Sequence, residues 1–237
     1  MGLLLGVSQG PLLSQDAAEI LHKMDEVLFA PDDQQSEVRM ILTDRGGNER
    51  VREASVWQKG ADMRLFRFTS PAAEAGIAFL SLPDEVMYLY MPAYGRERRI
   101  ASHVKNQSFA GTDFSYEDLE AERYTERFSA KLKDQATDRW ILELTPLPHL
   151  RSDYSKIIAH VHKENHYPIK MESYDRGGQL YKVAEYTFGR QGDYWFTEEI
   201  MMTNKRRNHS TRMVFEKVIL NSGIGDEVFT VRNLGRF

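Results

Sequence analysis

The sequence predicts a mainly β protein with few helices, in which one meandering antiparallel sheet forms most of the fold. Alternating segments, about eleven or twelve of them, follow one another at spacings near ten residues, and Gly or Asp turns join them. Aromatic residues make up 11% of the 237 residues and lie mostly in these segments, which favours strands. Only one segment has the spacing of a long amphipathic helix, so a parallel βαβ architecture is disfavoured.

That helix is expected at residues 14–29. Ser14 has the side chain of an N-cap residue, and Pro31 closes the segment. The apolar residues recur at steps of three and four and form one stripe: Ala17, Ile20, Leu21, Met24, Val27 and Leu28. Such a stripe must lie against another part of the protein.

The rest of the chain is predicted as strands. Their expected ranges are 36–44, 49–60, 62–70, 76–82, 85–92, 122–132, 139–146, 155–163, 167–175, 180–190, 193–203, 210–221 and a short 229–234. Gly46 and Gly47 can take positive φ in the first turn, and residues 176–179 form another glycine turn. No linker or repeat interrupts the pattern, so residues 14–237 are predicted to form a single domain.

Composition narrows the class of protein. The net charge is −4 and the isoelectric point is near 6.0, which argues against broad electrostatic binding to nucleic acid. There is no cysteine, so disulfides and thiolate chemistry are excluded. No apolar run approaches the ~20 residues that span a bilayer. Residues 1–13 are interpreted as the remnant of a signal peptide or a disordered N-terminus, because Leu3 to Val7 form a short apolar patch.

The middle of the chain, residues 92–122, shows no sustained alternation and separates its charges. Residues 96–105 carry four basic and one acidic side chain, and residues 113–126 carry six acidic and one basic. A connection of this length is often functional. We expect it to cross the mouth of the sheet with its charges outward, and Arg96, Arg98 and Arg99 are the candidates for contact with a partner or membrane. The alternative is a surface crossover whose opposite charges pair with each other.

No catalytic constellation, metal site or cofactor site is predicted. His160 and His162 share a strand face and His166 follows, a pattern that would suit zinc but also suits solvent-facing histidines on a hairpin. Ser102 and Lys105 have the S-x-x-K spacing of penicillin-recognising enzymes, without the other motifs of that class. A basic turn at residues 205–212 is typical of a charged hairpin tip.

Several segments together resemble one known family. They are FTSPAAEAGIAFLSL (68–82), YLYMPAYGRERRI (88–100), FAGTDFSYEDLE (109–120), YDRGGQLYKV (174–183) and residues 211–236. In this order they are similar to the outer-membrane lipoprotein-sorting (LolA-like) proteins of bacteria. The resemblance implies a strongly curved antiparallel sheet, an incomplete β-barrel closed by the N-terminal helix and by a lid of loops and helices.

The resemblance also implies a function. It indicates a periplasmic, non-enzymatic carrier or receptor for lipid or for the acyl chain of a lipoprotein, with an inner-membrane exporter or an outer-membrane acceptor as partner and only peripheral membrane contact. Two alternatives stay open. One is a protein-interaction module or chaperone with a residual cavity, and the other is a metallohydrolase that uses the histidines.

The candidate lining of the hydrophobic cavity comes from aromatic residues on the predicted strands. They are Trp57, Phe66, Phe68, Tyr88, Tyr90 and Trp195. Each strand presents only one parity to a hollow, and the opposite set with Leu65 and Leu89 is the alternative. The same residues could instead fill the barrel as an ordinary core.

Overall fold

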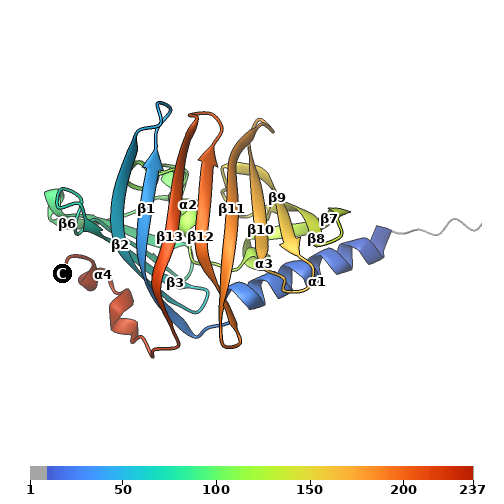
Figure 1. Ribbon diagram of the computed structural model, residues 1–237, viewed down its shortest axis with the longest axis horizontal. Helices are drawn as coiled ribbons and strands as arrows, with labels where there is room; N and C mark the ends of the chain where they lie inside the picture. Colours follow the sequence, from blue (N-terminus) through green and yellow to red (C-terminus); the bar gives the residue numbers. More distant parts are fainter. Residues whose placement is uncertain (1–9, 237) are drawn as a thin grey trace, which may run out of the picture.

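Within residues 10–236, which the computed structural model describes, thirteen strands form one antiparallel sheet (Figure 1). The strands are β1 (Asp33–Thr43), β2 (Glu49–Lys59), β3 (Met63–Ser70), β4 (Ala78–Leu82), β5 (Val86–Met91), β6 (Arg96–Arg99), β7 (Phe128–Gln135), β8 (Arg139–Pro146), β9 (Tyr154–His162), β10 (Pro168–Asp175), β11 (Leu180–Gln191), β12 (Tyr194–Asn204) and β13 (His209–Leu220). The sheet is strongly curved and does not close.

The order of the strands explains the shape. It is β6-β5-β4-β3-β2-β1-β13-β12-β11-β10-β9-β8-β7, so each strand pairs with its sequence neighbour and β1 pairs with β13. Only β6 and β7, which are also consecutive in sequence, lack a mutual ladder and form the two edges. The sheet is therefore an up-and-down barrel left open at one seam. The predicted mainly β fold with an incomplete antiparallel barrel is confirmed.

Two predicted strands differ from the structure, and one observed strand was not predicted. Residues 229–234 do not form a strand, because the chain makes a 3₁₀ turn at Asp226–Phe229 and the short helix α4 (Val231–Leu234). The segment predicted as a strand over 122–132 begins with a helical turn, α3 (Tyr124–Arg127), before β7. Strand β6 was not predicted, because its sequence Arg-Glu-Arg-Arg has no apolar alternation.

The N-terminal helix α1 runs from Gly10 to Leu28, four residues earlier than predicted, so Ser14 lies inside it and is not its cap. Its predicted stripe is buried at Ala17, Leu21 and Met24, and the helix packs against β7 and α3 (Figure 1). Residues 10–13 are thus helical rather than a disordered end, and the rest of the proposed signal remnant, residues 1–9, lies outside the described residues. Among the described residues no helix is long and apolar enough to cross a membrane.

The segment of residues 100–127 joins the two edge strands and covers the concave side of the sheet. It contains a 3₁₀ turn at Phe109–Gly111 and the short helix α2 (Tyr116–Leu119). Phe109, Phe114, Tyr116 and Leu119 are all buried in the main core together with residues of the sheet. In Figure 1 this green segment lies behind the strands, on the concave side of the curve. We call residues 100–127 the crossing segment.

A second, smaller core lies on the convex face. Leu65, Ala78 and Leu80 pack there against Phe229 and Leu234 of the C-terminal segment. Helix α4 contacts β4 and β5 at this end of the sheet. The curved sheet is therefore covered on both faces at β3–β5, by the crossing segment on the concave side and by the C-terminus on the convex side.

Candidate functional site

A cavity of about 190 Å³ lies on the concave side of the sheet, between the strands and the crossing segment. A buried water needs at least about 10–15 Å³ by the same kind of measure, so the cavity has room for roughly a dozen. More than half of its lining residues are apolar, while polar groups also face it; the apolar ones are Leu28, Phe29, Val56, Phe66, Phe114, Leu119, Phe128, Ile157, Pro168, Met171, Ala184, Phe188, Trp195, Phe196, Ile200, Met202, Met213 and Phe215.

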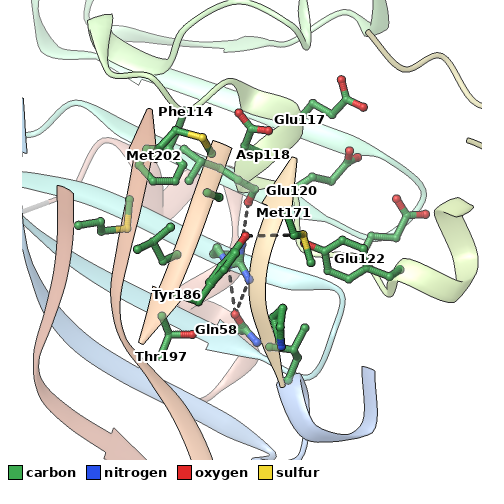
Figure 2. A pocket seen from close by; sticks show the side chains of 18 of the residues that line it. Gln58, Phe114, Glu117, Asp118, Glu120, Glu122, Met171, Tyr186, Thr197 and Met202 are labelled. Carbon is green, nitrogen blue, oxygen red and sulfur yellow. Dashed lines mark hydrogen bonds between the residues drawn. The ribbon is translucent and has the colours of Figure 1, made fainter. Parts of the chain in front are cut away.

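Strand alternation positions this wall. Met171, Ala184 and Met202 are cross-strand partners on β10, β11 and β12, so they stand side by side on the concave face. Figure 2 shows Met202 beside Phe114, which comes from the crossing segment. Methionine side chains are flexible and polarizable, so a wall built from them can adapt to apolar ligands of different shape.

An aromatic plug closes one end of the hollow. The ring of Phe109 lies 5.3 Å from the rings of both Phe66 and Phe68 and 5.8 Å from that of Phe79, measured between centroids. These are the separations of favourable aromatic pairs. Because Phe109 fills the concave face at Phe68 and Phe79, the cavity begins only on the other side of Phe66.

Glu126 of the crossing segment is exposed, but Glu117, Asp118 and Glu120 point inward, which corrects the expectation that they face a partner. Each is matched by a cation: Lys105 Nζ–Glu120 Oε1 (2.7 Å), Lys182 Nζ–Asp118 Oδ2 (2.7 Å) and Arg127 Nη2–Glu117 Oε1 (3.1 Å). Burial opposes ionisation of Asp118, but the Lys182 ammonium outweighs it and the pKa of Asp118 is lowered. The alternative, in which the opposite charges of the segment pair with each other, holds for Lys105 and Glu120.

The first half of the crossing segment is tied to β13. Asp113 Oδ2 lies 2.6 Å from His209 Nδ1 and accepts a hydrogen bond of 2.8 Å from the Thr211 hydroxyl. The chain turns at Gly111, whose φ is 77°. Ser115 then caps α2 and exchanges hydrogen bonds with Asp118. These contacts fix the position of the crossing segment relative to the sheet, so a hollow remains between the two.

Two arginines, Arg64 and Arg127, line the cavity, and Arg64 comes from the sheet. Arg64 is on β3 at the same parity as Phe66 and faces the concave side, where it is paired across the ladder with Gln58 on β2 and Ser81 on β4. Its Nε and Nη2 donate to Gln58 Oε1 at 3.1 and 2.6 Å, and its Nη1 donates to the Leu119 carbonyl at 3.0 Å. Burial lowers the pKa of Arg64 to about 10, so it stays charged at neutral pH.

Two tyrosines complete the polar part of the wall. The Tyr124 and Tyr186 hydroxyls both donate to Met171 Sδ, at 3.4 and 3.8 Å, and Figure 2 shows Tyr186 directed toward the centre of the cavity. Burial raises the pKa of both phenols, so both remain neutral donors at physiological pH. The cavity thus combines apolar walls with a few polar groups at one place, as ligand sites commonly do.

Glu122 is the titratable carboxyl of the wall with the most perturbed ionisation. Burial, and then repulsion from Glu120, raise its pKa to about 7, although Arg127 opposes the shift from 3.6 Å. In Figure 2 the carboxylates of Glu117, Glu120 and Glu122 gather on one side, away from the Tyr186 hydroxyl.

The structure brings two of the six predicted cavity residues to the cavity. Phe66 and Trp195 line it. Phe68 points to the same face but is fully buried against Phe109, so it belongs to the core.

The other three aromatics face away, and their assignment to the concave side is wrong. Tyr88 pairs with Leu80 across the β4–β5 ladder, which places it on the convex face, and Tyr90 has the same parity. Trp57 pairs with Leu65 and is also convex. All three pack around the small C-terminal core, because both parities of these strands are apolar and alternation alone did not identify the concave one.

The three arginines predicted as contact residues lie on the edge strand. Arg96, Arg98 and Arg99 are all exposed on β6. The Arg98 guanidinium lies 4.7 Å from the centre of the Tyr94 ring. A charged edge also prevents further strands from pairing there.

The histidines do not assemble. His162 stacks on Tyr167, with ring centroids 4.9 Å apart, and burial lowers the pKa of His160 and of His166. Within the described residues, no three or more His, Asp or Glu side chains are grouped so that they could hold a metal ion.

Sequence reasoning missed the polar residues of the cavity, Arg64, Gln58, Tyr124 and Tyr186. A signal was present for one of them, since Arg64, Phe66 and Phe68 alternate on one strand face. A cationic side chain on the strand face that points to the core is unusual unless a specific polar or charged group binds it. For Tyr124 no such signal exists, because it lies in the crossing segment and reaches the cavity only through tertiary packing.

Comparison with known proteins agrees with this architecture. A family model described as an uncharacterized protein matches residues 60–236. A crystal structure described as an outer membrane lipoprotein-sorting protein domain from Vibrio parahaemolyticus is 26% identical, with a TM-score of 0.87, over 94% of this chain and 100% of that chain. No curated protein matches the sequence.

Two further structures share the fold. A DUF1329 family protein from Desulfovibrio piger is 24% identical, with a TM-score of 0.87, over 94% of this chain and 99% of that one. A LolA superfamily protein from Nitrosomonas europaea is 23% identical, with a TM-score of 0.76, over 90% and 97% of the two chains. The three structures therefore share the overall fold of this chain.

Proposed function

The chain belongs to the outer-membrane lipoprotein-sorting (LolA-like) family, and from this premise we propose that it is a carrier or receptor that binds the apolar chain of a lipid or lipoprotein in the concave cavity. The observation that carries the proposal is the cavity itself. A sheet whose hollow were only a core would be filled by its covering segment, whereas here the segment fills one end with Phe109 and leaves about 190 Å³ beyond Phe66.

The chemistry of the wall suits such cargo. Burial of each CH₂ group contributes about 0.8 kcal/mol and needs no directed contact, so an acyl chain can bind a wall of phenylalanine and methionine side chains. The LolA-like carrier fold is non-enzymatic in general. The protein would accordingly hold its ligand and release it without changing it.

The family also points to a place of action. One protein of the same fold is described as an outer membrane lipoprotein-sorting protein domain, and we propose that the present protein acts in the periplasm between a membrane donor and an acceptor. The exposed arginines of β6 lie beside the crossing segment and would approach an anionic membrane surface or an exporter.

Native mass spectrometry of the gently purified protein tests the proposal. We expect a population whose mass exceeds the apo mass by that of a lipid, and saturable uptake of a fluorescent fatty acid. An Ala184→Phe variant places a ring at the cavity wall and should reduce uptake several-fold. Ala18→Phe, at an exposed position of α1, is the matched control.

The result that contradicts the proposal is equally definite. A wild-type protein that carries no lipid and takes up no apolar probe is not a carrier of this kind. Equal uptake by wild type and Ala184→Phe, with both proteins folded, would place binding outside the cavity.

A further inference from the structure

Arg64 carries a charge that no carboxylate balances among the residues the structure describes. Its three hydrogen bonds go to neutral acceptors, the side-chain oxygen of Gln58 and the carbonyl of Leu119. A guanidinium has five N–H groups, so two are left without a protein acceptor in the described part of the chain. A charge held inside a protein without a counter-ion is costly unless it has another role.

Four other interior cations of this protein have a different environment. Each has a carboxylate at short distance: Arg52 with Glu74 (2.6 Å), Lys105 with Glu120 (2.7 Å), Lys182 with Asp118 (2.7 Å) and Arg127 with Glu117 (3.1 Å). Arg64 has no such carboxylate within the described residues, and it lies at the cavity wall.

The nearby carboxylates are already engaged. Asp118, Glu117 and Glu120 also line the cavity, but each is bound to its own cation. Glu122 lies nearest to Arg127, at 3.6 Å. Within residues 10–236 no carboxylate of the cavity wall is therefore paired with Arg64, so the anionic group of a ligand would supply its counter-charge.

We propose that the cargo of this carrier is an amphiphile with an anionic group, a carboxylate or a phosphate, which binds the Arg64 guanidinium inside the cavity while its apolar chain lies along the methionine and phenylalanine wall. The planar guanidinium offers parallel N–H groups to such an anion. Gln58 orients it, and the Tyr186 hydroxyl in the same wall would become a further donor by turning its O–H from the Met171 sulfur to the anion. The inference rests on the proposed function and specifies which ligands the cavity prefers.

The test compares probes that share one apolar chain and differ in the head group. Dissociation constants are measured for a long-chain fatty acid, its uncharged methyl ester, and a lysophosphatidic acid with the same chain. Wild type should bind at least one of the two anionic probes roughly tenfold or more tightly than the ester, since hydrogen bonds to charged groups are the strong ones. Whichever anion binds more tightly identifies a carboxylate or a phosphate as the recognised group.

Arg64→Gln should then bind all three probes with similar affinity, at about the level that wild type shows for the ester. Arg67→Gln is the matched control, because Arg67 is on the same strand, faces the convex side and donates to the Asn233 carbonyl. Thermal melting of each variant reports whether it is folded, and the wild-type comparison of acid with ester stands even if Arg64→Gln does not fold.

The outcomes separate this inference from the function on which it rests. Equal affinity of wild type for the ester and both anions overturns the inference and leaves the carrier intact. A loss of ester and anion binding together in Arg64→Gln, with a lower melting temperature, overturns it too, because Arg64 would then only fasten the crossing segment at Leu119. Binding of no probe by wild type would overturn the carrier proposal itself.

Discussion

Phe66 and Phe68 differ by two positions on β3 and share one face, yet they have different roles. Phe66 borders the cavity, whereas Phe68 is 1% exposed and stacks on Phe109 at 5.3 Å with an angle of 13° between the rings. A residue of the filled core and a residue of an open wall respond differently to truncation. At the scale of single residues, the covering segment decides which role an apolar side chain takes.

Phe68→Ala should therefore lower the free energy of unfolding by about 3–5 kcal/mol, the usual cost of removing a core aromatic. Chemical denaturation measures this loss, and uptake of a fluorescent fatty acid by the folded fraction should stay near wild type. Tyr88→Ala, on the half-buried convex side, should cost less stability and leave uptake unchanged. A specific loss of uptake in folded Phe68→Ala would show that this residue lines the cavity and does not belong to the core.

Glu122 makes stability depend on pH. Its pKa is raised from 4.5 to about 7 in the folded protein, so the folded state favours the protonated carboxyl. Stability from this group is fully present below about pH 4.5 and is lost as the pH rises through 7. The groups that face it are Glu120, Glu85, Arg127 and Lys105.

Glu122→Gln removes this titration. The variant should gain stability relative to wild type as the pH rises from 4.5 to about 7, with no further change above that, and urea denaturation at a series of pH values measures the difference. A difference that stays constant across this window would show that the pKa of Glu122 is not raised by folding.

At the scale of elements, helix α1 closes one end of the hollow. Leu21 is 1% exposed and packs in the main core, and Asp25, on the same helix, accepts hydrogen bonds of 2.9 Å from the backbone N–H groups of Tyr124 and Thr125. Helix α1 thus binds both the sheet and the start of α3. An element with two such attachments should be essential for the fold.

Leu21→Asp places an unpaired charge in that apolar contact and should destabilise the protein strongly, by several kcal/mol. Differential scanning calorimetry measures the effect, and Ala18→Asp, at an exposed position of the same helix, is the control with the same added charge. A melting temperature of Leu21→Asp equal to that of the control would mean that α1 does not dock on the sheet.

At the scale of the whole molecule, charge is distributed between the interior and one edge. The acidic residues of the crossing segment are neutralised inside, while Arg96, Arg98 and Arg99 remain exposed on β6. The net charge of −4 therefore coexists with a basic edge beside the lid. Such an edge attracts anionic surfaces over roughly the Debye length, about 8–10 Å at physiological salt.

Reversal of this edge charge should weaken docking but not loading. Arg98→Glu combined with Arg99→Glu should reduce binding to vesicles that contain anionic lipid, as measured by co-sedimentation at low and moderate salt, while uptake of a fatty acid probe stays largely unchanged. The double variant Arg45→Glu and Arg50→Glu changes charge by the same amount at the exposed β1–β2 hairpin and is the control. Unaltered vesicle binding by the β6 variant would show that these arginines do not dock the protein on membranes. Their role would then be to prevent further strands from pairing with β6.

The sequence by itself determined the local elements and their order. Alternation and turn residues located twelve of the thirteen described strands with small boundary errors, and the spacing of Ala17, Leu21 and Met24 identified the one amphipathic helix and its buried face. These features depend on neighbours within a few positions, so periodicity is sufficient to read them. Strand β6 was missed because its charged sequence shows no apolar alternation. It forms a strand through its pairing with β5.

Only the tertiary structure decided which face of each strand is concave. Strands β3 and β5 are apolar at both parities, since one side meets the crossing segment and the other meets the C-terminal segment, so no pattern within them distinguishes Tyr88 from Leu89. The same holds for charge: whether Glu120 faces solvent or Lys105, and whether Arg64 has a counter-ion, depends on residues far away along the chain. Contacts across the hollow of a curved sheet form only when the sheet has curved and the crossing segment has packed on it. Both depend on the whole chain.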